Sequence, residues 1–525
     1  MTPSSGWSIS FGWSIDLAPK RRLPILLPVV LLTTAFTATG VQAGGYDPAG
    51  DINSMASTTD YTGAQAWWAA GYTGQGVDVA LIDSGVAPVD GLNAPGKVVH
   101  GPDLSLESQA PNLATLDTYG HGTFMAGLIA ARDASLTAPY GQAPASAYRG
   151  MAPDARIVSL KVATADGGTD VSQVIAAIDW VVQHRHDDGM NIRVLNLSYG
   201  TNSTQWFGVD PLTYAVEQAW DAGIVVVAAA GNSGYQTKGS SPALANPAFD
   251  KRILAVGASD PMGTPSLVDD TMPDFSAAAK TGSARAPDLV APGVHLQGLR
   301  VANSWIDANV DGKTVLDDRF MRGSGTSEST ALVSGAAALI LSKYPDATPD
   351  QVKRLLKVTA FDMPTQNSRE VGSGEIRLGL ALTTPLPLYV QTVEPARGGG
   401  SLELARGSDH LTRDGVVLKG EQDIFGKPFN SVAMAVLEAA RSAWSGGTWN
   451  GSVWTGSSWS GSSWSGIRWS GSSWSGSSWS GSSWSGNSWS GSSWSGSSWS
   501  GSSWSGSRWS GSSWSGNSWS TAGWN

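Results

Sequence analysis

The feature that most constrains the fold of this chain is a series of short apolar runs that alternate with amphipathic stretches. Four runs rich in valine, isoleucine, leucine and alanine cover residues 77–82, 156–162, 194–198 and 223–230. Apolar runs of this length are typical of strands buried on both faces, as in a parallel sheet covered by helices.

Stretches with helical periodicity separate these runs. Residues 170–183 and 211–222 place apolar side chains three and four positions apart, as one face of a helix requires. Strand and helix therefore alternate between about residues 61 and 382. This alternation predicts an α/β domain with a doubly wound parallel sheet.

The C-terminal part is a repeat. From Trp444 to Trp524 a tryptophan occurs at every fifth position, and Arg468 and Arg508 are the only charged residues. A period of five fits neither one face of a helix nor one face of a strand. Two interpretations of residues 444–525 remain open: a disordered or loosely ordered Gly/Ser-rich tract, and a repeat array that forms a compact solenoid or stacks on wall carbohydrate.

Residues 383–443 differ in character from both neighbouring parts. Prolines and the run Gly398-Gly399-Gly400 suggest a linker, whereas residues 402–404 and 416–418 suggest short strands. We expect a linker with a small β-rich or poorly ordered segment.

The N-terminus has the pattern of a secretory signal peptide over residues 1–43. Basic residues 20–22 precede an apolar stretch at 23–32, and small residues follow at positions 41 and 43. We expect cleavage after Ala43, a short linker over residues 44–60, and a secreted, extracellular or wall-associated protein. A retained membrane anchor is the alternative, although the apolar stretch is short and contains two prolines.

Net charge and composition exclude several classes of partner and reactive group. The formal net charge of −10 argues against nucleic acid or an anionic membrane as the main partner. The chain contains no cysteine, which excludes disulfides, thiol nucleophiles and cysteine-ligated zinc.

Two polar residues stand where an open α/β sheet places its sites. Asp83 follows the first apolar run, at the carboxyl end of a predicted strand. His121 lies between Gly120 and Gly122, ahead of a small-residue apolar helix that would anchor it. Each segment alone also has a purely structural interpretation, as a turn or cap for Asp83 and as a packed histidine for His121.

A serine and an asparagine complete the set. Ser327 begins a long apolar helix, so its backbone N–H and the helix dipole would face an oxyanion formed on an attacked carbonyl. The structural alternative is an ordinary helix N-cap. Asn232 ends the fourth apolar run, and its side-chain amide is a neutral donor suited to an oxyanion. The four segments together, in this order, point to nucleophilic catalysis.

On these segments the chain resembles the subtilases, the subtilisin-like peptidases of family S8, over residues 61–382, and the order Asp, His, Ser matches theirs. The resemblance implies that Asp83 orients His121 and that His121 deprotonates Ser327, which attacks the peptide carbonyl to form an acyl-enzyme. It further implies that Asn232 and the backbone amide of Ser327 hold the oxyanion.

The resemblance also implies a substrate groove. Ser198, Tyr199 and Gly200 would pair with the peptide backbone as an added strand. Ala229, Ala230 and Gly231 would form the wall of a roomy, uncharged S1 pocket that accepts large apolar side chains. The implied groove residues are Ser198, Tyr199, Gly200, Ala229, Ala230 and Gly231.

The chain departs from the family pattern in two places. The family usually has Met-Ala-Thr-Pro-His after the nucleophile, whereas this chain has Glu328 and then Ser-Thr-Ala-Leu, so we expect different packing behind the serine. Subtilases typically carry a folding prodomain after the signal, but only seventeen residues separate Ala43 from Tyr61. We expect folding without one, or with the linker or tail in its place.

One acidic cluster has the pattern of a calcium loop. Asp307, Asn309 and Asp311 match the start of a loop of the EF-hand type, and Asp318 occupies its twelfth position. We favour a polar insertion loop because no flanking helices are evident. We therefore expect no metal ligands and no required cofactor, with structural calcium as the alternative.

The sequence thus predicts a secreted serine endopeptidase (EC 3.4.21) that acts on proteins or peptides, with cell-wall polysaccharide as a partner of the tail. The alternative from another class is a wall-associated binding or structural protein with an inactive protease-like domain. The intact set of candidate residues argues against this alternative. A lipase or esterase is disfavoured because Gly-x-Ser-x-Gly is missing around Ser327.

Overall fold

The computed structural model describes most of the chain after residue 45. The described ranges are 46–108, 113–234, 244–279, 285–310, 312–408, 410–413, 416–445 and 447–454, together with the backbone of the strands between Ser458 and Ser520. The predicted signal peptide lies outside these residues. Across the described ranges, no helix has both the length and the hydropathy needed to span a bilayer.

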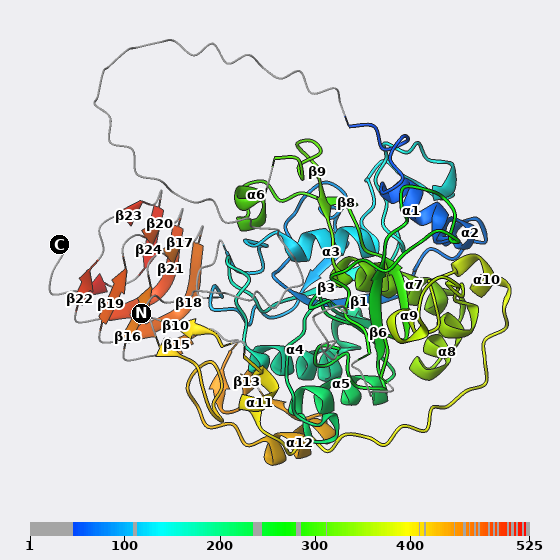
Figure 1. Ribbon diagram of the computed structural model, residues 1–525. Coiled ribbons are helices and arrows are strands. Elements are labelled where there is room, and N and C mark those ends of the chain that lie inside the picture. The colour runs from blue at the N-terminus through cyan, green and yellow to red at the C-terminus, as the bar shows by residue number, and fades with distance from the viewer. Residues whose placement is uncertain are drawn as a thin grey trace, which may run out of the picture.

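A parallel sheet lies at the centre of the structure (Figure 1). It has seven strands, paired in the order β2-β3-β1-β4-β5-β6-β7. Strand β1 lies inside the sheet, with β3 and β2 on one side and the later strands on the other. This order is doubly wound and confirms the predicted α/β fold. The strands are β1 (Asp78–Asp83), β2 (Val98–His100), β3 (Arg156–Lys161), β4 (Ile192–Leu197), β5 (Val225–Ala229), β6 (Leu254–Ser259) and β7 (Leu289–Pro292).

Helices cover the sheet on both sides, with α3 and α7 packed together and α4 packed on α5 (Figure 1). The two predicted helices are α4 and α5, and they begin at caps formed by Asp170 and Asp210. The helices are α1 (Met55–Tyr61), α2 (Ala64–Ala69), α3 (His121–Ala130), α4 (Val171–His184), α5 (Pro211–Asp221), α6 (Trp305–Asn309), α7 (Thr326–Lys343), α8 (Pro349–Thr359), α9 (Ser368–Val371), α10 (Leu378–Thr383), α11 (Leu402–Arg406) and α12 (Ser431–Ala439). An antiparallel pair, β8 (Leu296–Leu299) and β9 (Phe320–Gly323), precedes α7.

The packed structure begins earlier than the predicted boundary at residue 61. Helix α1 starts inside the predicted linker, and its Met55 side chain is buried in the core. Trp67 and Trp68 of α2 are also buried, and their indole N–H groups donate to the carbonyl oxygens of Leu378 (2.8 Å) and Met151 (2.9 Å). Helix α2, near the start of the domain, therefore binds Leu378, near its C-terminal end.

The segment after residue 383 packs on the domain and is partly helical. Residues 402–404, predicted as a strand, lie in α11, so that prediction is wrong. The Ser401 hydroxyl accepts from the backbone N–H of Leu404 (3.1 Å), and Leu402 and Ala405 are buried on one face of the helix. The prediction of a strand near 416–418 agrees with the antiparallel pair β10 (Thr412–Arg413) and β11 (Val416–Val417).

The first tryptophans of the repeat belong to the core of the domain. The indole N–H of Trp444 donates to the carbonyl oxygen of Ala176, and that of Trp449 donates to the Asp179 carboxylate, both on α4 (2.8 and 2.7 Å). The short antiparallel strands here are β12 (Trp444–Ser445), β13 (Thr448–Trp449) and β14 (Ser452–Val453).

Beyond residue 457, β15, β18 and β21 lie in one group of strands (Figure 1). Each residue pairs in parallel with the residue twenty positions further on, as Ser458 with Ser478 and Ser473 with Ser493. Paired residues are therefore four pentapeptide units apart in the sequence. Disorder and wall binding of the tail stay predictions. The strands are β15 (Ser458–Ser460), β16 (Ser463–Gly466), β17 (Trp469–Ser470), β18 (Ser473–Ser480), β19 (Ser483–Gly486), β20 (Trp489–Ser490), β21 (Ser493–Ser500), β22 (Ser503–Ser505), β23 (Trp509–Ser510), β24 (Ser513–Gly516) and β25 (Trp519–Ser520).

Candidate active site

Asp83 is the last residue of β1, at the carboxyl edge of the sheet. The strand is buried along its whole length, because β3 and β4 pair with it on either side. The carboxylate accepts from the backbone N–H of Ser84 (2.7 Å), which orients it beyond the strand end. Asp83 therefore lies where open α/β sheets place reactive groups.

His121 is the first residue of α3, and the two glycines beside it have specific structural roles. Gly120 adopts φ +105°, a left-handed conformation that favours glycine. A side chain on Gly122 would overlap the carbonyl oxygen of Gly85, so α3 starts directly against the end of β1. This close approach places the imidazole beside Asp83.

The start of α3 is capped by Asp117. Its carboxylate accepts from the backbone N–H groups of Gly120 (2.6 Å) and Thr123 (2.7 Å), and from the Ser84 hydroxyl (2.8 Å). Burial raises the pKa of Asp117, and these hydrogen bonds oppose that rise. Asp117 thus fixes the loop that presents His121.

The central contact of the site joins the histidine to the aspartate. Nδ1 of His121 lies 2.8 Å from Oδ1 and 3.0 Å from Oδ2 of Asp83, and both side chains are buried. Burial by itself lowers the pKa of His121, but the charge and hydrogen bond of Asp83 outweigh it, so the pKa is raised. The arrangement suits a histidine that accepts a proton.

Ser327 is the second residue of α7, which packs against α3. Its Oγ is buried and has no hydrogen-bond partner within the described ranges. The Ser198 hydroxyl donates to the Ser327 carbonyl oxygen (3.2 Å), and Asn196 donates to Ser198 (3.0 Å). The backbone N–H groups of the first helical turn have no acceptor inside the helix, and that of Thr326 donates to Asn232, so the N–H of Ser327 is the candidate donor to an anion.

Asn232 is bound to the residue before Ser327. Its Oδ1 accepts from the backbone N–H and from the hydroxyl of Thr326, both at 2.9 Å. Because both contacts occupy the amide oxygen, the amide nitrogen is the group oriented away from Thr326. The loop after β5 is thereby locked against the start of α7.

The predicted S1 residues adjoin the same contact. The backbone N–H of Gly231 donates to the Thr326 hydroxyl (3.2 Å), and the Ala230 carbonyl oxygen accepts from Ala245 (2.8 Å). Ala229 is buried at the end of β5. The predicted S1 wall thus lies one hydrogen bond from the nucleophile segment.

The predicted substrate segment, Ser198 to Gly200, directly follows β4. Ser198 contacts Ser327 as described, and Tyr199 is buried. A side chain on Gly200 would approach the Ala245 Cβ to 2.6 Å, so the segment lies close against the loop beside the S1 wall. All predicted site residues therefore lie around the carboxyl ends of β1, β4 and β5.

Glu328 is a buried carboxyl next to Ser327, the candidate nucleophile, and the sequence did not identify it as part of the site. Burial raises its pKa to about 8, the nearby His121 opposes the rise, and Asp83 adds to it. Neither carboxyl oxygen has a hydrogen-bond partner within the described residues. The neutral acid is therefore the stable form in the fold at neutral pH.

The calcium prediction concerns Asp307, Asn309 and Asp311. Asp307 lies in α6 and forms an ion pair with Arg300 (2.5 Å), while the side-chain amide of Asn309 donates to the Trp305 carbonyl oxygen (2.7 Å). Asp311 lies outside the described residues. Nowhere in the described ranges do three metal-binding side chains gather. The expectation of no metal at this loop stays a prediction, and structural calcium stays its alternative.

Sequence reasoning missed several residues that build the site. Thr326 connects Asn232 and Gly231 to the nucleophile segment, and Asn196 connects Ser198 to the Ser334 hydroxyl of α7 (2.9 Å). One signal was available, since Asn196 is a polar residue at a fully buried position between two leucines of β4. Thr326 carries no comparable signal.

Comparisons with known proteins agree with this geometry. The model of the Subtilase family matches residues 74–375. Serine protease AprX of Bacillus subtilis (strain 168) is 36% identical over 308 residues, which is 58% of this chain and 65% of AprX. Subtilisin DY of Bacillus licheniformis is 32% identical over 295 residues, which is 56% of this chain and 87% of that protein. Subtilisin BL of Lederbergia lenta is 31% identical over 297 residues and is covered to 88%.

Proposed function

The chain belongs to the subtilase family of serine endopeptidases, and from this premise we propose that it is a secreted endopeptidase with Asp83, His121 and Ser327 as its catalytic triad. The observation that carries the proposal is the 2.8 Å contact between His121 Nδ1 and the Asp83 carboxylate, beside the start of α7. The pattern of a signal peptide at residues 1–43 supports secretion.

In the proposed mechanism, Asp83 holds the proton of the histidine on Nδ1, so Nε2 carries the lone pair that accepts the Ser327 proton. The serine oxygen attacks the peptide carbonyl carbon. His121 then donates the proton to the leaving amine, and an acyl-enzyme remains. Water then attacks the acyl carbonyl carbon while His121 accepts its proton. His121 returns this proton to the Ser327 oxygen as the acid product leaves.

The oxyanion of the tetrahedral intermediate needs donors in fixed positions. The Asn232 amide nitrogen and the backbone N–H of Ser327 are the proposed donors, and the Thr326 contacts hold the Asn232 side chain in place. The small residues at the S1 wall, including Ala229 and Gly231, support a preference for large apolar side chains before the scissile bond.

The test is labelling with an active-site-directed peptidyl phosphonate, read by intact and peptide mass spectrometry. We expect one adduct on Ser327, none on Ser327→Ala, and normal labelling of Ser324→Ala, a matched control three residues upstream. Absence of labelling on the intact chain would refute the enzyme proposal and favour an inactive, protease-like binding protein. The N-terminal peptide of the exported protein tests secretion, with cleavage after Ala43 expected.

A further inference from the structure

The connection between α10 and α11 includes an exposed segment without regular secondary structure. We call residues 385–390 the linking segment, and they lie beyond the family match, which ends at residue 375. The segment runs as a bare trace after α10 (Figure 1). Leu388 is 98% exposed and Val390 is 79% exposed, the two largest values among the large apolar side chains of the described residues. The segment is therefore accessible to another protein.

The backbone of the linking segment is free to pair with another strand. None of its N–H or carbonyl groups has a hydrogen-bond partner within the ranges that the structure describes. Pro385 and Pro387 restrict φ and direct the residues before them toward extended conformations. Because successive N–H groups of an extended chain point to opposite sides, the prolines leave the N–H groups of Leu386 and Leu388 together on one edge. The segment thus has the form of a peptide that adds to the edge of a groove.

Leu388 also has the type of side chain that the proposed S1 pocket prefers, because it is large, apolar and uncharged. The next most exposed apolar side chains of the described residues, Val416 and Val436, lie in β11 and α12, where the backbone is already hydrogen-bonded. A protease must draw several substrate residues into an extended strand, which disrupts the hydrogen bonds of a helix or a sheet. The linking segment has none to lose and is the better substrate.

The linking segment ends at the edge of the sheet opposite the candidate site. The backbone N–H of Gln391 donates to the Asp350 carboxylate (2.9 Å), and the Gln391 side-chain amide donates to the Arg252 carbonyl oxygen (2.8 Å). Arg252 lies just before β6, at the amino edge, whereas the candidate catalytic residues lie at the carboxyl edge. The six residues of β6 span roughly 20 Å between these edges.

The other end of the linking segment is also fixed. The backbone N–H of Thr384 donates to a carbonyl oxygen of α10 (3.1 Å), and Leu378 and Ala381 of this helix are buried in the core. With both ends bound, the segment cannot reach the active site of its own chain. Hydrolysis in the folded protein therefore requires the active site of a second molecule.

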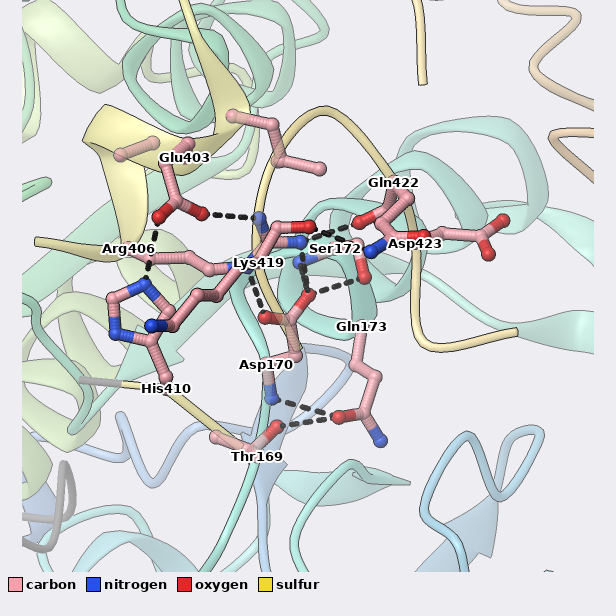
Figure 2. A network of polar contacts seen from close by, with 12 residues as sticks. Thr169, Asp170, Ser172, Gln173, Glu403, Arg406, His410, Lys419, Gln422 and Asp423 are labelled. Atoms are coloured by element: carbon pink, nitrogen blue, oxygen red, sulfur yellow. Dashed lines mark hydrogen bonds and ion pairs between the residues drawn. The ribbon is translucent and has the colours of Figure 1, made fainter. Parts of the chain in front are cut away.

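The part of the chain after the linking segment is bound to the peptidase domain at several separate places. The backbone N–H of Ala396 donates to the buried Glu217 carboxylate (2.8 Å). Arg406 is fully buried, and its guanidinium donates to the carboxylate of Asp170, the N-cap of α4 (2.6 Å; Figure 2). The indole groups of the first repeats also bind α4. These contacts stay in place when the linking segment is cut.

We propose that the peptide bond between Leu388 and Tyr389 is a processing site, hydrolysed by the active site of a second copy of this chain, and that the two products remain associated. This inference rests on the proposed function. Leu388 enters the S1 pocket of the other copy, and residues 386–388 pair with its segment 198–200. The product is a two-chain protein whose tryptophan repeat is held to the peptidase domain without a covalent connection.

The reaction follows the proposed mechanism. The Ser327 oxygen of one copy attacks the Leu388 carbonyl carbon of the other, and the C–N bond breaks as His121 donates its proton to the Tyr389 nitrogen. Water then releases the acyl group. One water molecule is consumed, and a carboxylate on Leu388 and an amino group on Tyr389 are formed.

The experiment uses the full chain with Ser327→Ala as substrate and a small amount of wild type as enzyme, with peptide mass spectrometry as the measurement. We expect the earliest new termini at Leu388 and Tyr389. Adding Leu388→Asp to the substrate should slow hydrolysis of this bond about tenfold or more, because a carboxylate is costly in an apolar pocket. The matched control adds Val432→Asp, at an exposed valine of α12, and should leave the rate unchanged.

Two further measurements test the second copy and the association of the products. For wild type alone, we expect the initial rate of this cleavage to rise with the square of the protein concentration. A rate proportional to concentration would overturn the role of a second copy. The two fragments should co-elute in size-exclusion chromatography and separate in urea, and separation without urea would overturn their association.

The outcomes also distinguish this inference from the proposed function. If wild type cleaves peptide anilides but leaves the bond after Leu388 intact, or cleaves the Leu388→Asp chain there at an undiminished rate, the inference is wrong and the proposed function stands. If wild type neither takes up the phosphonate nor cleaves any substrate, the proposed function fails and the inference fails with it.

Discussion

Glu328 offers a direct test of the electrostatics beside Ser327, the candidate nucleophile. The perturbation is Glu328→Gln, which keeps the shape of the side chain and removes its charge. The native carboxyl is fully buried, without a hydrogen-bond partner for either oxygen in the described part of the chain. Its ionisation in the fold is therefore opposed by desolvation, and the pKa is raised to about 8.

The magnitude follows from linkage. A carboxyl with a pKa raised from 4.5 to about 8 contributes stability that is fully present below pH 4.5 and is lost as the pH rises through 8. The loss is on the order of 1 kcal/mol at pH 5 and 5 kcal/mol at pH 9, taken as upper values for one isolated group. The Gln variant has no such loss, so its free energy of unfolding relative to the wild type rises with pH.

The assay is urea unfolding between pH 5 and pH 9, with Ser327→Ala in every chain to prevent self-digestion. Glu394→Gln serves as the matched control, because the Glu394 side chain is 66% exposed. We expect the stability difference for Glu328→Gln to grow steadily up to pH 8 and then level off. A difference that is constant across this range would refute the argument, since it would mean that Glu328 is ionised or neutral to the same extent in both states.

Three further predictions follow from the site and the core. Asp83→Asn removes the acceptor that orients His121, and we expect kcat to fall by about 10⁴-fold with little change in the unfolding midpoint. Asn232→Ala removes the proposed oxyanion donor and should lower kcat by about 10²–10³-fold with a smaller effect on KM, measured on a peptide anilide. Burial raises the pKa of Asp179 from 3.8 to about 8, so Asp179→Asn, which keeps an acceptor for Trp449, should stabilise the fold in urea unfolding by a few kcal/mol above pH 7 and by about 2 kcal/mol at pH 5, with little effect at pH 3.

The fold could be predicted because its central strands have an unambiguous pattern. Four apolar runs coincide with β1, β3, β4 and β5 to within two residues at each end. A strand buried on both faces is mostly apolar along its length, and these runs are too short for a buried helix, so length and composition together identify them. The prediction failed at residues 402–404, where Leu-Glu-Leu alternates like a strand but Ser401 caps a helix whose apolar face is buried by distant parts of the chain.

The candidate site was predictable for a different reason. Asp83, His121 and Ser327 each occupy the end of a regular element, and a strand end or helix start can be located from local sequence. Thr326 could not be found in this way, because its role depends on a contact with Asn232, which is 94 residues away in the chain. The Arg406–Asp170 ion pair spans 236 residues and has no local signature at all.

The tryptophan repeat shows how one sequence pattern takes two structural roles. Helix α4 has fourteen residues and is about 21 Å long, so only a few repeats can lie along it. Trp444 and Trp449 donate to acceptors on this helix, and Trp454 packs on their rings at 6.2 and 6.0 Å. Later repeats have no further length of α4 to bind, and their described backbone strands pair with strands of other repeats instead. The first units also differ in sequence from the later ones, and Asn450 donates to the Asp423 carboxylate (2.8 Å), so both the length of α4 and the residues of the first units fix the start of the repeat to the peptidase domain.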